Sequence, residues 1–191
     1  MLVKDILSQA AFLLGKEELS RYLQGQAEET LTEEQEKSFQ SESESLLRCY
    51  NIVENEIALD YLPLTAEETI VCSTGALPYT SFMRPPVSVL SVTDEYGNKL
   101  PFTVFPEYLR LRAGTAVVVY SYSPESKRLS DYSDYSTRVG ERTFAYGVAC
   151  EYCLIAGLYE EALVWDKKYK DALLCAQSTS RPRVIRSRRW V

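Results

Sequence analysis

Apolar residues at helical spacing mark the N-terminal third of the chain. One face of a helix over residues 3–14 carries Val3, Ile6, Leu7, Ala10, Leu13 and Leu14. Gly15 ends this helix, and Gly25 ends a short second one that begins at Lys16. The longest stripe consists of Phe39, Ser43, Leu46, Tyr50, Val53 and Ile57, spaced 4-3-4-3-4. With a capping-box pattern at Thr32 and Gln35, it predicts a helix over about 32–60, roughly 40 Å long.

A second helical pattern covers residues 141–176. Its apolar positions are Phe144, Val148, Tyr152 and Ile155, then Leu158, Ala162, Trp165, Tyr169, Leu173 and Ala176. Gly157 lies in the middle and predicts a kink or a break, because glycine costs about 1 kcal/mol in a helix interior. Asp166 and Lys170 are spaced to form an i,i+4 ion pair.

Alternating, β-branched segments lie between the two helical regions. They predict strands over 69–72, 87–93, 102–105, 108–112 and 115–122, with a hairpin turn at 94–99. In the fourth strand, Leu109 and Leu111 should point inward and Arg110 and Arg112 outward. Short strands with local connections indicate a small antiparallel sheet. A polar loop then runs from 123 to 140.

These patterns predict an α+β protein. We expect a mainly helical bundle formed by both chain ends, an inserted small antiparallel β subdomain and an extended C-terminal arm. The expected divisions are residues 1–65 for the N-terminal helices, 66–125 for the β subdomain, 126–178 for the C-terminal helices and 179–191 for the arm.

Composition places the chain among ordinary globular proteins. It has 191 residues, of which 46% are hydrophobic and 25% charged. No apolar run approaches the ~18 residues that span a bilayer, so we expect no membrane association. The first residues do not have the layout of a signal peptide, which favours a cytoplasmic protein.

The sequence offers little to catalysis. It contains no histidine, and it lacks the glycine-rich motifs that bind phosphates and dinucleotides. Cys150 and Cys153 form a C-x-x-C pair, but the pair lies within an apolar helical pattern and has no second pair to complete a zinc site. We therefore expect core cysteines, no catalytic residue, no metal and no cofactor.

The C-terminal segment differs from the rest of the chain. The formal net charge is −6, and the five arginines of residues 181–191 contribute +5, so the preceding residues sum to −11. Arg and Trp dominate energetic hot spots at protein interfaces. The predicted docking residues are Arg181, Arg183, Ile185, Arg186, Arg188, Arg189 and Trp190. The alternative is a solvated basic end that keeps the chain soluble.

In the order of its elements the chain resembles head–tail connector (adaptor) proteins of tailed bacteriophages. Residues 3–15 resemble their opening helix, and residues 144–150 through 169–173 resemble their ring-forming helix. Arg188, Arg189 and Trp190 resemble their C-terminal arm.

The resemblance implies a homo-oligomeric ring, usually of twelve subunits, in the virion neck, assembled in the cytoplasm of the bacterial host. The arm would dock on the portal protein, and a downstream neck or tail component would bind elsewhere. Packaged DNA would pass through without specific binding. Tyr152, Leu158, Trp165 and Tyr169 are the residues expected on the helix that builds the bundle and the oligomer.

Three other interpretations remain open. A generic protein-interaction module needs only the basic arm. A nucleic-acid-binding protein would place the arginines on phosphates, although a body of net charge −11 would repel DNA. An enzyme that uses carboxylates and some of the 14 tyrosines is the weakest alternative, because tyrosines are common in cores and interfaces.

Overall fold

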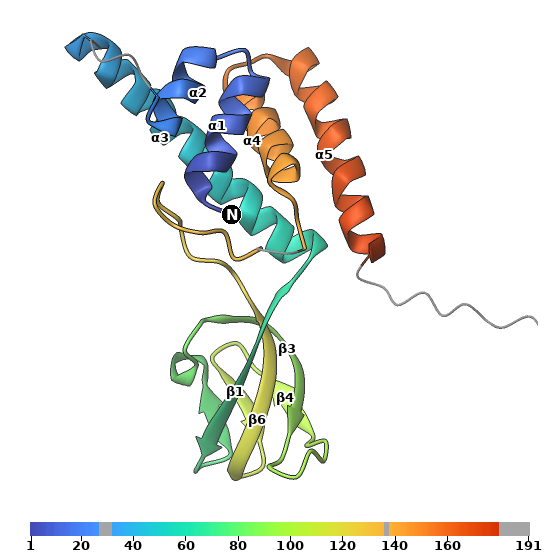
Figure 1. Ribbon diagram of the computed structural model, residues 1–191. Coiled ribbons are helices and arrows are strands. Elements are labelled where there is room, and N and C mark those ends of the chain that lie inside the picture. The colour runs from blue at the N-terminus through green and yellow to red at the C-terminus, as the bar shows by residue number, and fades with distance from the viewer. Residues whose placement is uncertain (27–31, 136–137, 180–191) are drawn as a thin grey trace, which may run out of the picture. The chain divides into compact units, whose positions relative to one another are not determined.

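A computed structural model of the protein describes residues 1–26, 32–135 and 138–179 (Figure 1). Its helices are α1 (Val3–Leu13), α2 (Glu17–Gln24), α3 (Glu33–Glu56), α4 (Glu141–Ile155) and α5 (Tyr159–Thr179), with a π-helical turn at Ile57–Tyr61 and a 3-10 turn at Tyr79–Ser81. Its strands are β1 (Leu64–Cys72), β2 (Ala76–Pro78), β3 (Pro86–Thr93), β4 (Phe102–Val104), β5 (Tyr108–Leu111) and β6 (Gly114–Tyr122).

The chain is therefore α+β, as predicted. The described residues contain five α-helices and two small three-stranded antiparallel sheets, and the N-terminal helices pack with α4. They form two compact units. The helical unit consists of residues 1–54 and 126–179, and the β unit consists of residues 55–125. The predicted arm lies outside the described residues apart from Thr179, which ends α5.

The predicted stripe on α3 forms the centre of the helical unit. Leu46, Tyr50 and Val53 are fully buried, and the Tyr50 ring packs 5.5 Å from that of Phe144 on α4. At its start, Thr32 and Gln35 form the predicted capping box, in which each backbone N–H donates to the other residue's side chain at 3.1 and 3.4 Å. Periodicity thus located the core of this unit correctly.

Gly147 explains how closely α4 approaches its neighbours. A Cβ at this position would lie 2.7 Å from Cγ1 of Val53 on α3 and 3.0 Å from the ring of Tyr169 on α5. Real Cβ atoms essentially never make contacts under 3.0 Å. The glycine that weakens the helical propensity of α4 is therefore what allows three helices to meet at this point.

Gly157 has the role predicted for it. It has φ +77°, the left-handed conformation that glycine adopts without steric cost, and it separates α4 from α5. The Leu158 N–H donates to the Cys153 carbonyl at 2.8 Å, which closes the turn at the end of α4. The predicted helical region is therefore two helices, broken between Ile155 and Tyr159.

The β unit contains two sheets with the strand orders β1-β6-β3 and β2-β5-β4. Leu109 and Leu111 of β5 point into a core shared with Val118 and Tyr120 of β6, while Arg110 and Arg112 are exposed, as the alternation predicted. The turn predicted after β3 is present, but it does not join two paired strands, because β3 pairs with β6 and β4 pairs with β5. The Asp94 carboxylate accepts hydrogen bonds from the backbone N–H groups of Tyr96 and Asn98 at 2.9 and 2.8 Å.

Three details of the sequence prediction were wrong. β1 begins at Leu64, five residues before the predicted Thr69, and β2 was not predicted. Ile155 was placed on the buried face, but it is 68% exposed. In the part of the chain that the structure describes, no helix is both long and apolar enough to cross a membrane.

Candidate interaction surface

Exposed apolar residues of the helical unit gather where α4 turns into α5. They are Leu154, Ile155, Leu158, Tyr159, Leu163 and Val164, which are 43–70% exposed, and we call this cluster the corner surface. The break at Gly157 creates it, because the end of α4 and the start of α5 then both present apolar side chains to solvent. Contiguous exposed apolar residues of this kind mark sites of interaction with other macromolecules.

Charge is unevenly distributed along α5. Its first turn carries Glu160 and Glu161, and its middle carries the cationic side chains of Lys167, Lys168 and Lys170. Lys170 forms the predicted ion pair with Asp166, at 2.7 Å. The Lys168 ammonium lies 4.3 Å from the centre of the Trp165 ring. Acids therefore lie among the corner-surface residues of α5, and lysines and further acids follow them along the helix.

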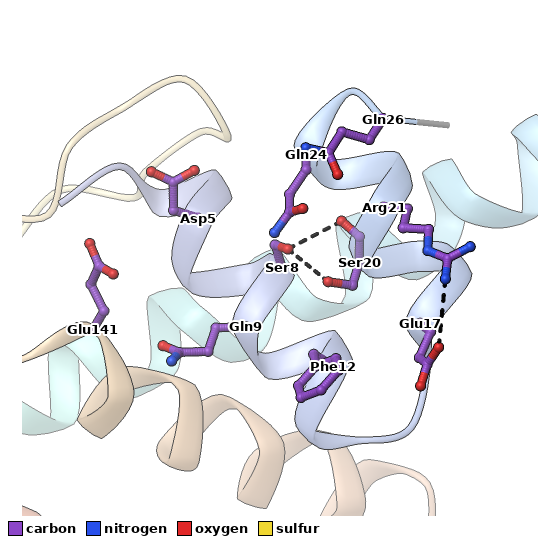
Figure 2. A pocket seen from close by; sticks show the side chains of 10 residues that line it. All are labelled: Asp5, Ser8, Gln9, Phe12, Glu17, Ser20, Arg21, Gln24, Gln26 and Glu141. Carbon is purple, nitrogen blue, oxygen red and sulfur yellow. Dashed lines mark hydrogen bonds and ion pairs between the residues drawn. The ribbon is translucent and has the colours of Figure 1, made fainter. Parts of the chain in front are cut away.

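A polar pocket of about 550 Å³ lies at α1, α2 and the start of α4 (Figure 2). Figure 2 shows Asp5 and Glu141 toward one end and Glu17 and Arg21, which form an ion pair at 3.9 Å, toward the other. Phe12, at its edge, is 61% exposed. Three carboxylates and one guanidinium give the lining a net negative charge, which suits a cationic partner.

The pocket lacks the geometry expected of a hydrolase. Its most buried hydroxyl, that of Ser8, donates to the Ser20 carbonyl at 3.1 Å and lies 2.8 Å from the Ser20 hydroxyl. Ser8 is thus held inside the protein between α1 and α2 and is not presented as a nucleophile.

The cysteines of α4 are core residues. Cys150 and Cys153 are buried, and together with Ala162 they pack α4 against α5. Burial raises the pKa of the Cys153 thiol, and burial beside Glu151 raises that of Cys49 to about 11. A buried thiol with a raised pKa is a poor nucleophile at neutral pH. Among the residues that the structure describes, no three His, Cys, Asp or Glu side chains are grouped so as to hold a metal ion.

The structure places the four predicted helix residues in different environments. Tyr169 is buried in the core, and Tyr152 and Trp165 are half-buried. Trp165 stacks on Tyr146 with a centroid distance of 5.8 Å, and the Tyr152 ring lies 4.9 Å from the Lys16 ammonium. Leu158 alone belongs to the corner surface. The predicted docking residues from Arg181 to Trp190 lie outside the described residues.

Sequence reasoning missed most of the corner surface. The available signal was the apolar residues that do not fit a single helical stripe, such as Leu163 and Val164 beside the core residue Ala162. They could have been identified as a second apolar face. No protein-family model matches the chain, and no curated protein matches its sequence.

Proposed function

We propose that this chain is a structural virion protein, a head–tail connector subunit of a tailed bacteriophage that forms a ring on the portal and extends the DNA channel toward the tail. The observation that carries the proposal is the corner surface, which leaves six apolar side chains of α4 and α5 available to a second copy. In this proposal the helical unit is the ring-forming bundle, and the inserted β subdomain binds a downstream neck or tail component.

The arrangement of the helices supports head-to-tail association. α2 packs on α1, α1 on α4, and α4 on α5, so α2, which also contacts α3 through the Tyr22 and Phe39 rings, and α5 lie at opposite ends of this series of contacts (Figure 1). The two ends present different surfaces. When the end of one copy binds the opposite end of the next and the rotation closes, the result is a ring.

The lysines in the middle of α5 would meet acids in the same contact, although α5 as a whole also carries Glu160, Glu161, Asp166 and Asp171 and has a net charge of −1. The pocket at α1 and α2 has Asp5, Glu17 and Glu141 in its lining, and α5 carries Lys167, Lys168 and Lys170. In the proposed contact, α5 of one subunit binds beside the pocket of the next, with the corner surface supplying apolar area and the lysines facing the carboxylates. Such complementarity sets the register of an interface more than its affinity.

The body of the protein suits a DNA conduit. Residues before the arm have a net charge of −11, and the arm carries +5. A surface with the same sign of charge as the phosphates does not retain DNA, so packaged DNA would pass without specific binding. The arm, with its arginines and Trp190, would dock on the portal, and many identical weak contacts in one ring would give strong attachment.

Self-association should depend on the corner surface. We expect Leu163→Glu to raise the protein concentration that ring formation requires at least tenfold, because it places a charge in the apolar contact. Native mass spectrometry and analytical ultracentrifugation across a concentration series, alone and with the portal, would measure this. The control is Val71→Glu, which changes an equally exposed residue (71% against 70%) of the β unit. Equal assembly of wild type and both variants would contradict the proposed contact.

Attachment to the portal should depend on the arm. Deleting residues 181–191 should change the free energy of unfolding by less than about 1 kcal/mol, since the apolar positions of α5 end at Ala176. It should nevertheless abolish capture by the portal. Trp190→Ala should weaken docking by about 2 kcal/mol per subunit, and replacement of the arginines by lysine should also weaken it.

A pull-down on immobilised portal, followed by cryo-electron microscopy of the complex, tests the arm. Unchanged occupancy of the portal by the truncated chain would refute docking through the arm. Binding that falls log-linearly with salt and is supported equally by DNA would instead identify the arm as a nucleic-acid-binding segment.

A further inference from the structure

Glu54 is a buried carboxyl group near the end of α3. Its side chain is 1% exposed. One oxygen, Oε1, accepts hydrogen bonds from the Tyr50 hydroxyl at 2.9 Å, the Ser133 hydroxyl at 2.9 Å and the Asp134 backbone N–H at 3.1 Å. The other oxygen, Oε2, is buried and has no hydrogen-bond partner in the described part of the chain. A buried acid with one saturated and one unpartnered oxygen is unusual, because buried polar atoms are nearly always paired.

Two of the three groups that donate to Glu54, those of Ser133 and Asp134, belong to the segment of residues 127–135, which leads into α4, and the third, that of Tyr50, lies on α3 itself. Another residue of α3 and the start of α1 also hold this segment. The Asn51 side chain of α3 accepts a hydrogen bond from the Lys127 N–H at 2.7 Å and donates one to the Lys127 carbonyl at 3.2 Å. At the start of α1, the Val3 N–H donates to the Asp131 carbonyl at 3.0 Å. Most of these contacts are neutral hydrogen bonds, and Glu54 is the fully buried carboxyl group among them.

Three other titratable groups face Glu54. Tyr50 lies on the same helix, and Lys127 and Asp134 lie on the segment. The Lys127 ammonium is paired with the Asp134 carboxylate at 2.9 Å, so its charge is largely neutralised by a group other than Glu54. Desolvation raises the pKa of the Glu54 carboxyl, and the hydrogen bonds from Ser133, Tyr50 and Asp134 and the attraction of Lys127 oppose this only in part.

We propose that Glu54 is a protonation-dependent latch. When its carboxyl group is neutral, it holds residues 127–135 on α3. When it loses its proton to water, the buried charge favours an open form in which the segment leaves α3 and the carboxylate is hydrated.

The sign follows from linkage. The closed form binds the proton more tightly than the open form, in which Glu54 has an ordinary carboxyl pKa. Opening is therefore independent of pH below the ordinary value and becomes easier as pH rises from that value to the raised one. Opening is coupled to the release of at most one proton. The equilibrium constant for opening therefore changes by at most tenfold per pH unit.

The latch goes beyond the proposed function. The segment lies on the connection between β6 and α4, so opening would free residues of that connection, including the buried Tyr135, whose ring packs 6.0 Å from that of Phe144, while leaving the core of the β unit intact. Partners of the opened form would then be favoured at higher pH, and partners of the closed form at lower pH.

Amide hydrogen exchange of the full-length protein between about pH 5 and 8.5 tests the latch. The probes are the amides of Ser133 and Asp134, which donate to the Met1 carbonyl and to Glu54. After correction for base-catalysed exchange, their protection should fall with rising pH, by up to tenfold per unit. Glu54→Gln keeps an acceptor at Oε1 but cannot ionise, so protection in this variant should be independent of pH.

Two comparisons can overturn the proposal. The buried α4 residue Val148 should keep its protection throughout, and an equal loss there would show global unfolding in place of a latch. An identical pH slope in Glu54→Gln would show that another group controls opening. Ser133→Ala supplies a second variant. It removes a hydrogen bond that favours the ionised form of Glu54, so the pH range over which protection falls should extend upward. An unchanged pH range would contradict the assignment of the latch to Glu54.

Discussion

Replacing Leu46 by aspartate is expected to unfold the helical unit. Leu46 is fully buried at the centre of the α3 stripe. An unpaired carboxylate at such a position costs several kcal/mol, which is comparable with the total stability of about 5–15 kcal/mol of a typical protein. Circular dichroism during thermal and urea unfolding would measure the loss. Val53→Asp, about two turns further along the same stripe, should have a similar effect.

The matched control for this prediction is Glu44→Ala. Glu44 lies on the same helix but is exposed, and we expect a change within about 0.5 kcal/mol. Glu42 is a poorer control, because its carboxylate pairs with the Lys16 ammonium at 2.8 Å and both side chains are only partly exposed. If Leu46→Asp melted at the same temperature as Glu44→Ala, the assignment of the buried face would be wrong.

The sequence predicted the helical unit well where a helix buries only one of its faces. The stripe from Ser43 to Ile57 is buried throughout, because a helix against a core repeats its contact every three or four residues. Ile155 fitted the same spacing and is nevertheless exposed. It is the last residue of α4, and no spacing rule shows that burial on this helix ends at Cys153, since Leu154 is exposed as well.

The β unit was less predictable where the strands are polar. Residues 64–68 carry Ala66, Glu67 and Glu68, which have low strand propensity, so the start of β1 could not be recognised. Pairing determines this segment, because Leu64 to Glu68 lie opposite Tyr122 to Val118 of β6, and the Tyr120 hydroxyl donates to the Glu68 carboxylate. Tertiary contacts of this kind override local propensity.

The sequence did not reveal the burial of Glu54 for the same reason. Glu54 follows Val53 in the sequence and looks like a solvent-facing acid, but residues about 80 positions later cover it. The tripeptide repeat Ser130-Asp-Tyr-Ser-Asp-Tyr135 supplies that cover through Ser133 and Asp134, and no local pattern indicates it. Long-range burial is set by topology, which spacing alone does not reveal.

Gly147→Val is the second substitution with a large expected effect. It should lower the free energy of unfolding by about 3 kcal/mol, the upper end of the range for overpacked cores, and the melting temperature by roughly 6–12 °C. A Cβ alone would lie 2.7 Å from Cγ1 of Val53, and valine adds two more carbons to this contact. The control is Gly140→Ser at the N-cap of α4. A Cβ there meets nothing within 4 Å, and serine is a favoured capping residue, so stability should be unchanged or slightly higher.

A double mutant separates packing from helix propensity. Gly147→Ala alone gains about 1 kcal/mol of propensity but meets Val53 and Tyr169, so we expect net destabilisation. Val53→Ala removes the carbon that the new methyl group would meet. If close packing is the reason for the glycine, the double mutant should be more stable than the sum of the single changes by about 1 kcal/mol or more. Additive effects in urea unfolding would show that α4 does not need its closest approach to α3, and that Gly147 is there for another reason.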